Sequence, residues 1–115
     1  MSDCIFCKII NKEIPSKIIY EDDLLISFYD VTPQAPVHFL VVPKEHIASA
    51  SEITPDNSAI VAKIFERISV MTKVMGIDQR FRVINNCGER AGQTVRHLHF
   101  HVLAWDDDGE PNTTL

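Results

Sequence analysis

Short apolar segments separated by polar, turn-forming segments dominate the hydropathy pattern of the chain. Segments rich in Ile, Leu, Val and aromatic residues and bounded by Asp, Pro or Gly are typical of β-strands. The sequence predicts five strands, at residues 16–20, 24–29, 38–42, 81–85 and 97–104. The acidic residues 21–23 supply a polar turn between the first two strands, and two prolines in residues 31–36 require an irregular loop before the third.

One long segment instead repeats its apolar residues every three or four positions, which is the period of one helix face. These residues are Ile60, Val61, Ile64, Phe65, Ile68, Met71 and Met75. The spacing predicts a helix over residues 55–75, with Thr54 as N-cap, Pro55 at the first helical position and Gly76 at its end. An apolar and basic stretch at residues 4–11 predicts a short helix ahead of the strands.

This order of elements predicts an α+β fold in a single domain spanning residues 1–115. We expect a mostly antiparallel sheet of about five strands, with one long helix and a short N-terminal helix. Because one long helix covers only one face of a sheet, the other face is available to a ligand or to a second subunit.

The charge and hydropathy of the chain exclude some classes of partner. The chain has 11 Lys and Arg against 16 Asp and Glu, a formal net charge of -5, and its basic residues are scattered. Binding to a nucleic-acid duplex needs a basic surface, so we expect no nucleic-acid partner. Apolar runs do not exceed four residues. We therefore expect no membrane span or signal peptide, and a cytoplasmic location.

Three of the five histidines occur at alternate positions of the last predicted strand, at His97, His99 and His101. Strict alternation places their imidazoles on one face of the strand, while the apolar residues between them point into the core. Three imidazoles in register indicate function rather than packing. They either bind a catalytic metal or act directly on a phosphate, with one ring attacking phosphorus and the others positioning charge.

The loop that precedes these histidines favours phosphate chemistry. Residues 85–94 contain two glycines, which let backbone N–H groups approach an anion closely. Asn86 and Thr94 add neutral hydrogen-bond donors to the same loop. A tightly bound metal would not need these groups.

Residues 92–102, Gly-Gln-Thr-Val-Arg-His-Leu-His-Phe-His-Val, resemble the histidine-triad motif of the HIT superfamily. Several N-terminal segments are similar to the Hint branch, the histidine-triad nucleotide-binding proteins; they are residues 5–10, 13–15, 29–31, 33–36, His38 and residues 43–46. The resemblance covers roughly residues 4–104. It implies a homodimeric HIT-like fold that binds a purine nucleoside monophosphate. It also implies hydrolysis of nucleoside 5'-phosphoramidates, such as adenosine 5'-monophosphoramidate or an AMP–lysine conjugate, through a nucleotidyl-histidine intermediate.

The resemblance further implies roles for individual histidines. His99 is the expected nucleophile, and His101 is expected to contact the phosphate and to assist the leaving group. Attack by a neutral imidazole requires the correct tautomer. A backbone carbonyl or His38 is expected to fix that tautomer by holding the other ring nitrogen of His99.

The resemblance also implies a nucleotide-binding set. Asp30 is expected to accept hydrogen bonds from the ribose hydroxyls, a role that suits a carboxylate. The residues implied to surround the phosphate oxygens are Asn86, Gly92, Gln93 and Thr94. The apolar residues implied to sandwich the purine are Ile5, Phe6, Ile9, Phe28, Val31 and Leu40.

The cysteines suggest a separate metal site. Three cysteines are too few for a disulfide framework, so Cys4-x-x-Cys7 indicates a metal-binding or redox pair. With His46 and His97 they form a Cys2His2 set of the kind that binds structural zinc, and similar sites occur in some superfamily members. A structural role for His97 agrees with His99 as the nucleophile. We expect catalysis itself to need no metal.

Two other hypotheses stay open. In the first, the protein is a zinc-dependent hydrolase in which two or three histidines of the triad bind catalytic zinc, so chelators abolish activity. In the second, it is a nucleotide-binding adaptor with incidental hydrolysis, marked by tight binding and very low turnover. The chain also departs from many Hint-branch members after the last strand, where Ala104, Trp105 and the acidic residues 106–108 replace a Gly-Gly-Arg and a longer tail. That departure leaves the leaving-group preference open.

Overall fold

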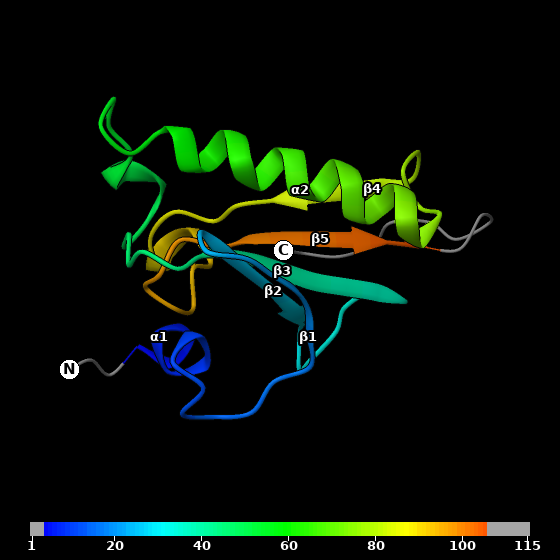
Figure 1. The fold of residues 1–115 in the computed structure, drawn as a ribbon, viewed down its shortest axis with the longest axis horizontal. Helices are drawn as coiled ribbons and strands as arrows, with labels where there is room; N and C mark the ends of the chain where they lie inside the picture. The colour runs from blue at the N-terminus through cyan, green and yellow to red at the C-terminus, as the bar shows by residue number, and fades with distance from the viewer. Residues whose placement is uncertain (1–3, 106–115) are drawn as a thin grey trace.

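The computed structural model describes residues 4–105 and shows an antiparallel sheet with a helix on each face (Figure 1). The helices are α1 (Ile5–Ile10) and α2 (Ala59–Met75), with 3-10 turns η1 (Ala50–Glu52) and η2 (Glu89–Ala91). The strands are β1 (Ile18–Glu21), β2 (Leu25–Tyr29), β3 (Val37–Pro43), β4 (Phe81–Ile84) and β5 (Phe100–Ala104). They pair in the order β1-β2-β3-β5-β4, and each pair is antiparallel. The predicted α+β class is confirmed.

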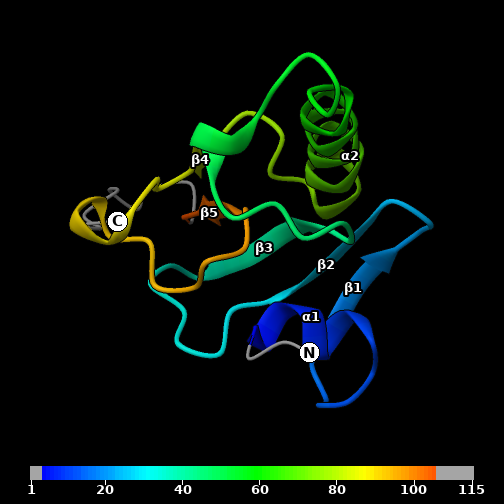
Figure 2. The ribbon, with the colours of Figure 1, turned by 90° about the vertical axis from the view of Figure 1, so that its left-hand side faces the viewer.

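The long helix α2 lies along one face of the sheet (Figures 1 and 2). It buries Ile64, Ile68 and Met71. The sheet side of this core, together with the segment that leads into β5, contributes Leu25, Phe39, Val41, Leu98, Phe100 and Val102. Burial of each large apolar side chain stabilises the fold by about 1.5–3 kcal/mol, so this face carries much of the stability.

The short helix α1 lies against the opposite face. Its buried residues Phe6 and Ile9 pack with Ile26, Phe28, Leu40 and Val42. Along β2 and β3 the even-numbered apolar residues therefore face α1, and the odd-numbered ones in the main core face α2, which is the two-residue period of a strand. Because α1 has only six residues, it covers part of this face.

The predicted start of the long helix is wrong. The helix begins at Ala59, one turn later than residue 55. Thr54 and Asn57 instead close a separate turn: the Thr54 N–H donates to Asn57 Oδ1 at 2.7 Å, and the Asp56 N–H donates to Thr54 Oγ1 at 3.2 Å. The predicted end holds, because Gly76 ends α2 in the left-handed conformation at a φ of 74°.

The predicted start of the last strand is also wrong. Strand β5 begins at Phe100, so His97, Leu98 and His99 precede it. The reason is a competing backbone hydrogen bond, in which the Leu98 N–H donates to the carbonyl of Ile47 at 2.6 Å. Residues 97–99 are therefore attached to the loop after β3 before the chain joins the sheet.

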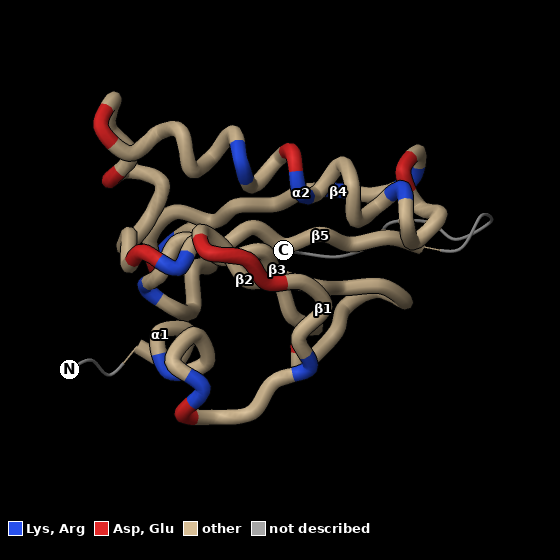
Figure 3. The backbone as a smooth tube through the Cα atoms, viewed as in Figure 1, with Lys and Arg blue, Asp and Glu red and all other residues tan. Residues whose placement is uncertain are grey.

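Lys and Arg residues lie at separate places on the backbone rather than in one patch (Figure 3). Within residues 4–105, no helix has both the length and the apolar character needed to cross a membrane. The acidic residues 106–108, on which the expected departure in the tail rests, lie outside the described residues.

Candidate active site and cysteine–histidine cluster

The three histidines of the motif lie on the α1 side of the sheet, even though two of them precede β5. The ring of His99 makes an edge contact with Phe6 of α1, with ring centroids 5.0 Å apart, and the ring of His97 makes a similar contact at 6.0 Å. Leu98 lies on the other side, in the core under α2. All three histidines are buried. The predicted alternation therefore holds in an extended segment that is only partly a strand.

A cavity of about 280 Å³ lies between α1 and the sheet. Its apolar lining consists of Ile5, Phe6, Ile9, Ile14, Pro15, Phe28, Val31, Leu40 and Val95. Its other lining residues are Ser16, Tyr29, Asp30, Thr32, Thr94, His99 and His101. The structure thus brings together every apolar residue predicted to sandwich a purine, as well as the predicted ribose ligand and the predicted nucleophile. His38, Asn86, Gly92 and Gln93 lie outside this lining.

The ring of His99 is fixed by the backbone. Its Nδ1–H donates to the carbonyl oxygen of His97 at 2.7 Å. A carbonyl only accepts, so the hydrogen of the neutral ring is on Nδ1 and the lone pair is on Nε2. Burial lowers the pKa of His99, and this favours the neutral form. Of the two groups expected to fix this tautomer, the structure shows the carbonyl.

His38 contacts His101 rather than His99. The two residues are diagonal neighbours on β3 and β5, because His38 pairs with Leu103 and Leu40 pairs with His101. His38 Nε2 lies 2.9 Å from His101 Nδ1, and the Gln34 N–H donates to His38 Nδ1 at 3.1 Å. Burial lowers the pKa of His38, and it lowers that of His101 to about 4.

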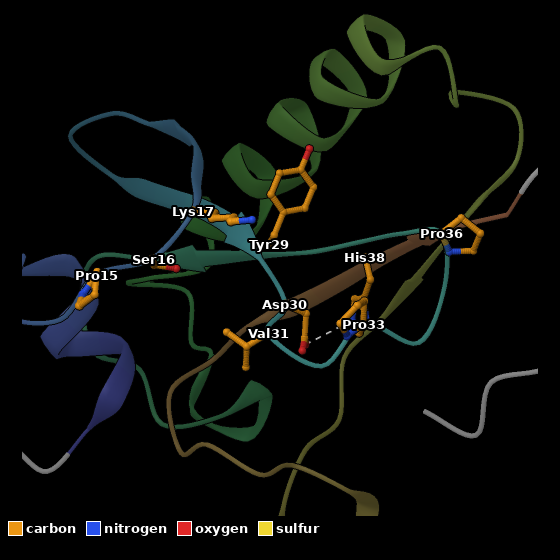
Figure 4. A pocket seen from close by; sticks show the side chains of 9 residues that line it. All are labelled: Pro15, Ser16, Lys17, Tyr29, Asp30, Val31, Pro33, Pro36 and His38. Carbon is orange, nitrogen blue, oxygen red and sulfur yellow. Dashed lines mark ion pairs between the residues drawn. The ribbon is translucent and has the colours of Figure 1, made fainter.

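Asp30 stands at the end of β2 beside this pair. One carboxylate oxygen accepts the Thr32 N–H at 2.8 Å, and the other lies 3.5 Å from His38 Nε2. Figure 4 shows the Asp30 carboxylate directed toward the His38 ring in a second hollow of about 780 Å³. That hollow adjoins the first cavity, because Pro15, Ser16, Tyr29, Asp30 and Val31 line both.

The predicted phosphate loop is held by the side chain of Gln93. Gly92 has a φ of 98°, and a side chain there would lie 3.6 Å from the Asn86 amide nitrogen. The Gln93 side chain is 5% exposed; its amide donates to the carbonyls of Ala48 and Val95, and its oxygen accepts the Gly88 N–H. The side chain of Gln93 therefore fixes the loop, while Thr94 reaches the cavity.

Two groups that position the site did not stand out in the sequence. Asn85 donates its side-chain amide to the carbonyl of His99 at 2.9 Å. The backbone amide of Gln34 fixes His38. Asn85 could have been noticed because it is a polar residue at the end of an apolar strand, beside the phosphate loop. The backbone amide of Gln34 could not, because every residue except proline has one.

His97 belongs to a cysteine–histidine cluster next to the cavity residues of α1. The ligand atoms of Cys4, Cys7, His46 and His97 all lie within 4.8 Å of one another. The Nε2–H of His97 donates to the carbonyl of Pro43 at 2.8 Å, so its Nδ1 lone pair faces the cluster. His97 Nδ1 lies 3.3 Å from Cys4 Sγ, 3.6 Å from Cys7 Sγ and 3.1 Å from His46 Nδ1.

This donor set fits zinc. With zinc bonds of about 2.3 Å to sulfur and about 2.0–2.1 Å to nitrogen, a tetrahedral site separates its sulfur and nitrogen ligands by roughly 3.5 Å. The separations in the cluster are close to that value. The carbonyl of Pro43 also holds the second nitrogen of His97, which is how a metal-binding histidine is usually oriented.

Comparison with known proteins agrees with the fold and the histidines. The family model described as "Scavenger mRNA decapping enzyme C-term binding" matches residues 3–114. An uncharacterised HIT-like protein of Synechocystis is 46% identical over 101 residues, which cover 88% of this chain and 89% of the relative.

Two solved structures are similar over nearly the whole length. A histidine triad protein from Clostridium difficile is 50% identical, with a TM-score of 0.90, covering 98% of this chain and 97% of that one. A HIT family hydrolase from Clostridium thermocellum is 44% identical, with a TM-score of 0.90, covering 98% of this chain and 99% of that one. The chain belongs to the HIT family.

Proposed function

We propose that this protein hydrolyses nucleoside 5'-phosphoramidates, of the adenosine 5'-monophosphoramidate or AMP–lysine type, after binding the purine nucleoside monophosphate portion in the cavity beside α1. The likeness to a structure described as a HIT family hydrolase supports hydrolysis in general. The observation that carries the proposal is the His99 ring, whose Nδ1–H is bound to the His97 carbonyl and whose Nε2 keeps a lone pair in a cavity also lined by Asp30.

The lining of the cavity suits each part of such a ligand. Apolar side chains from α1, β2 and β3 enclose a flat base, as is usual for small-molecule sites. The Asp30 carboxylate accepts hydrogen bonds from the ribose hydroxyls. The α-phosphate then lies beside Thr94, His99 and His101, with Asn86 and the backbone of Gly92 and Gln93 on the loop behind them.

The reaction proceeds in two displacements. Nε2 of His99 forms a bond to the α-phosphorus while the bond from phosphorus to the amine breaks, and the amine takes a proton from water. The ring is then cationic, and the His97 carbonyl at Nδ1 stabilises that charge. Water next adds its oxygen to phosphorus and releases a proton to the solvent, the bond from phosphorus to Nε2 breaks, and the nucleoside monophosphate leaves.

The test is hydrolysis of adenosine 5'-phosphoramidate by the wild type, by His99→Ala and by wild type after exhaustive chelation. We expect turnover by the wild type, at least about a 10³-fold loss in His99→Ala, and little change on chelation. Mass spectrometry of a rapidly quenched reaction should find the nucleotidyl group on His99. Activity that chelation abolishes and zinc restores, with no change in folding, would contradict this mechanism.

The hypothesis of a catalytic zinc on the triad finds less support. Among the described residues, the groups of ligand atoms close enough to share a metal each contain only one triad histidine. His97 directs its lone pair toward the cysteines, and Nδ1 of both His99 and His101 is already hydrogen-bonded. The adaptor hypothesis differs from the proposed function only in the rate of turnover. Tight nucleotide binding with very low turnover would favour it.

Two further features belong to the proposal. Cys4, Cys7, His46 and His97 hold a structural zinc, which supplies a link between α1 and the rest of the fold and takes no part in the reaction. A second copy of the chain covers the exposed apolar residues Val70 and Val74, which share one face of α2, giving a homodimer. Metal analysis and sedimentation equilibrium test these two features.

A further inference from the structure

We propose that Cys4 and Cys7 are a site of reversible oxidation, at which a disulfide between them loosens α1 and weakens nucleotide binding in the adjoining cavity. The inference rests on the proposed function, and it adds control of nucleotide binding by the oxidation state of two thiols. Three features support it: the closeness of the two sulfurs, their contacts with distant histidines, and the cavity residues on the same helix.

The two sulfurs are placed so that they can be joined. Cys4 is the N-cap of α1, and Cys7 lies in its first turn. The Cys7 N–H donates to Cys4 Sγ at 3.3 Å, which holds the Cys4 side chain against the end of the helix. Cβ atoms three positions apart on a helix are separated by about 5–6 Å, and a disulfide needs about 3.5–4.5 Å, so a small local movement is sufficient. Both thiols are half-buried, and a small reagent can therefore reach them.

In the reduced state the same sulfurs connect α1 to distant parts of the chain. Cys4 Sγ lies 3.3 Å from His97 Nδ1, 93 positions away in the sequence, and Cys7 Sγ lies 3.2 Å from His46 Nδ1, 39 positions away. His46 follows β3, and His97 precedes β5. These contacts hold α1 against the sheet side of the molecule, by hydrogen bonds to the thiols alone or by the proposed zinc.

A disulfide removes both connections. The new bond joins two residues at the same end of α1, so it attaches the helix to nothing else. A disulfide sulfur has no hydrogen to donate, and it is not the thiolate that zinc requires. Helices shorter than about 12–15 residues are marginal on their own, and α1 has six. After oxidation α1 therefore depends on the packing of Phe6 and Ile9 against the sheet.

The helix that is loosened supplies part of the cavity wall. Ile5, Phe6 and Ile9 line the cavity, and the Phe6 ring also makes edge contacts with the rings of His97 and His99. Figure 1 shows α1 on the side of the sheet opposite α2. If α1 is ordered for only a fraction of the time, the apparent affinity for the nucleotide falls by that fraction.

The reaction is thiol–disulfide exchange with a small disulfide such as oxidised glutathione. One cysteine thiolate attacks a glutathione sulfur, a mixed disulfide forms, and one glutathione thiol leaves. The other cysteine then attacks the mixed disulfide, the bond between Cys4 and Cys7 forms, and the second glutathione leaves. The protein gives up two electrons, and the two glutathione thiols gain them with two protons from the cysteines or the solvent. Bound zinc passes to the solvent, so zinc opposes the oxidation.

The first experiment measures AMP binding in defined oxidation states. The parent chain is Cys87→Ser, which leaves Cys4 and Cys7 as its only thiols. Calorimetry gives the Kd of AMP for the reduced zinc-loaded, reduced zinc-free and oxidised forms, and peptide mass mapping confirms the disulfide. We expect the two reduced forms to agree within about threefold, and the oxidised form to bind at least about tenfold more weakly. A thiol reductant should restore the affinity.

The double variant Cys4→Ser, Cys7→Ser in the same parent chain is the matched control. Its hydroxyls can contact the same two histidines but cannot be oxidised by glutathione. Its Kd for AMP should lie within about threefold of the reduced parent and should not respond to oxidised glutathione. A response of this control as large as that of the parent would overturn the inference, because the effect would not come from the two thiols.

The second experiment uses the reciprocity of the coupling. If the disulfide weakens AMP binding, AMP must oppose the disulfide by the same factor. The zinc-free parent chain is equilibrated in glutathione buffers of varied ratio, with and without saturating AMP, and the oxidised fraction is measured by mass spectrometry after rapid alkylation. We expect AMP to lower the equilibrium constant for disulfide formation at least about tenfold.

Three results would overturn the inference: no disulfide between Cys4 and Cys7 in oxidised glutathione, equal AMP affinity of the reduced and oxidised forms, or a disulfide equilibrium that AMP does not shift. A reduced zinc-free form as weak as the oxidised form would also overturn it, since the metal would then control α1. A protein that binds AMP as expected but cleaves no phosphoramidate would overturn the proposed hydrolysis alone. A protein that binds no AMP in any form would overturn both.

Discussion

Two groups of metal-ligating side chains lie on the α1 side of this sheet, and distance alone does not separate them. Cys4, Cys7, His46 and His97 bring their ligand atoms within 4.8 Å of one another, and so do Asp30, His38 and His101. The difference is in what the histidine nitrogens already bind. His97 donates Nε2–H to a carbonyl and turns its lone pair toward two thiols, whereas His38 and His101 bond to each other.

The comparison shows that hydrogen bonds to the second ring nitrogen decide what a histidine cluster can do. A lone pair among thiols suits zinc. His38 and His101 are hydrogen-bonded to each other and have no lone pair directed at a common point where a metal ion would bind. This group is instead suited to offering an N–H group to a ligand. We therefore expect substitutions in the first group to affect metal content and stability, and substitutions in the second to affect nucleotide recognition and turnover.

The largest effect should follow from removing the thiols. The double variant Cys4→Ser, Cys7→Ser should lose bound zinc completely, because oxygen ligands suit zinc less well than thiolates in such a site. At zinc concentrations a few hundred times the Kd, the lost binding should lower the free energy of unfolding by about 3–4 kcal/mol. Elemental analysis and denaturant titration measure the two quantities.

Cys87→Ser is the matched control for that variant. Cys87 is an exposed thiol outside the cluster, so its substitution should change neither zinc content nor stability. Zinc retained by the double variant at one ion per chain would place the metal elsewhere and would remove the distinction between the two groups.

Phe6 connects the two regions, and its loss should have the next largest effect. Its ring contacts both His97 and His99 edge-on, and it is 6% exposed. Phe6→Ala should lower the free energy of unfolding by about 3 kcal/mol, through lost burial and a residual cavity. Ile5→Ala on the same helix removes a side chain that is 47% exposed and should cost less than about 1 kcal/mol. Equal losses would mean that α1 is not anchored through Phe6.

Much of the fold could be predicted from the local pattern of the chain. The three- to four-residue period of α2 predicts which of its side chains face the core, and the structure follows it except at Phe65, which is 47% exposed. The start of α2 could not be predicted in the same way. Pro55 is compatible with the first turn of a helix, but Thr54 and Asn57 use their side chains to close a different turn.

The features of the candidate site could also be predicted only in part from the sequence. The histidines at the cavity were visible in the sequence because they carry the chemistry themselves, whereas Asp30 and the apolar residues of the purine site were predicted from the family resemblance. The partner of His38 was not visible, because it depends on the register of β3 against β5, where a shift of one residue would turn His38 to the other face. The tautomers of His99 and His101 depend on backbone groups, which residue identity does not reveal.

The pH dependence of stability reports on the burial of His101. Burial first, and then the neighbouring charges of His99 and His38, lower the pKa of His101 from 6.5 to about 4, against the attraction of Asp30. As the pH falls through 6.5, the unfolded chain therefore takes up this proton before the folded chain does. The contribution to stability is present above pH 6.5 and is lost as the pH falls toward 4.

The variant His101→Gln isolates this contribution. Between pH 7 and pH 5 the wild type should lose about 2 kcal/mol more stability than the variant, as measured by denaturant titration at each pH. His97 is the same in both chains, so the difference reports on His101. Parallel stability curves for the two chains would show that His101 does not resist protonation in the folded state.

The smallest effect on activity should come from substitution of Asp30, the carboxylate of the second group. Asp30→Asn keeps an oxygen to accept the Thr32 N–H but removes the charge, and should raise KM for adenosine 5'-phosphoramidate about five- to tenfold, because an ionised acceptor bonds hydroxyls more strongly. The 2'-deoxyribose analogue, which lacks one of the hydroxyls, should show a smaller rise. Asp22→Asn makes the same exchange in the β1–β2 turn and should leave both KM values unchanged. Equal rises in KM for the two substrates would show that the Asp30 carboxylate does not recognise the 2'-hydroxyl, and that its charge serves His38 and His101 instead.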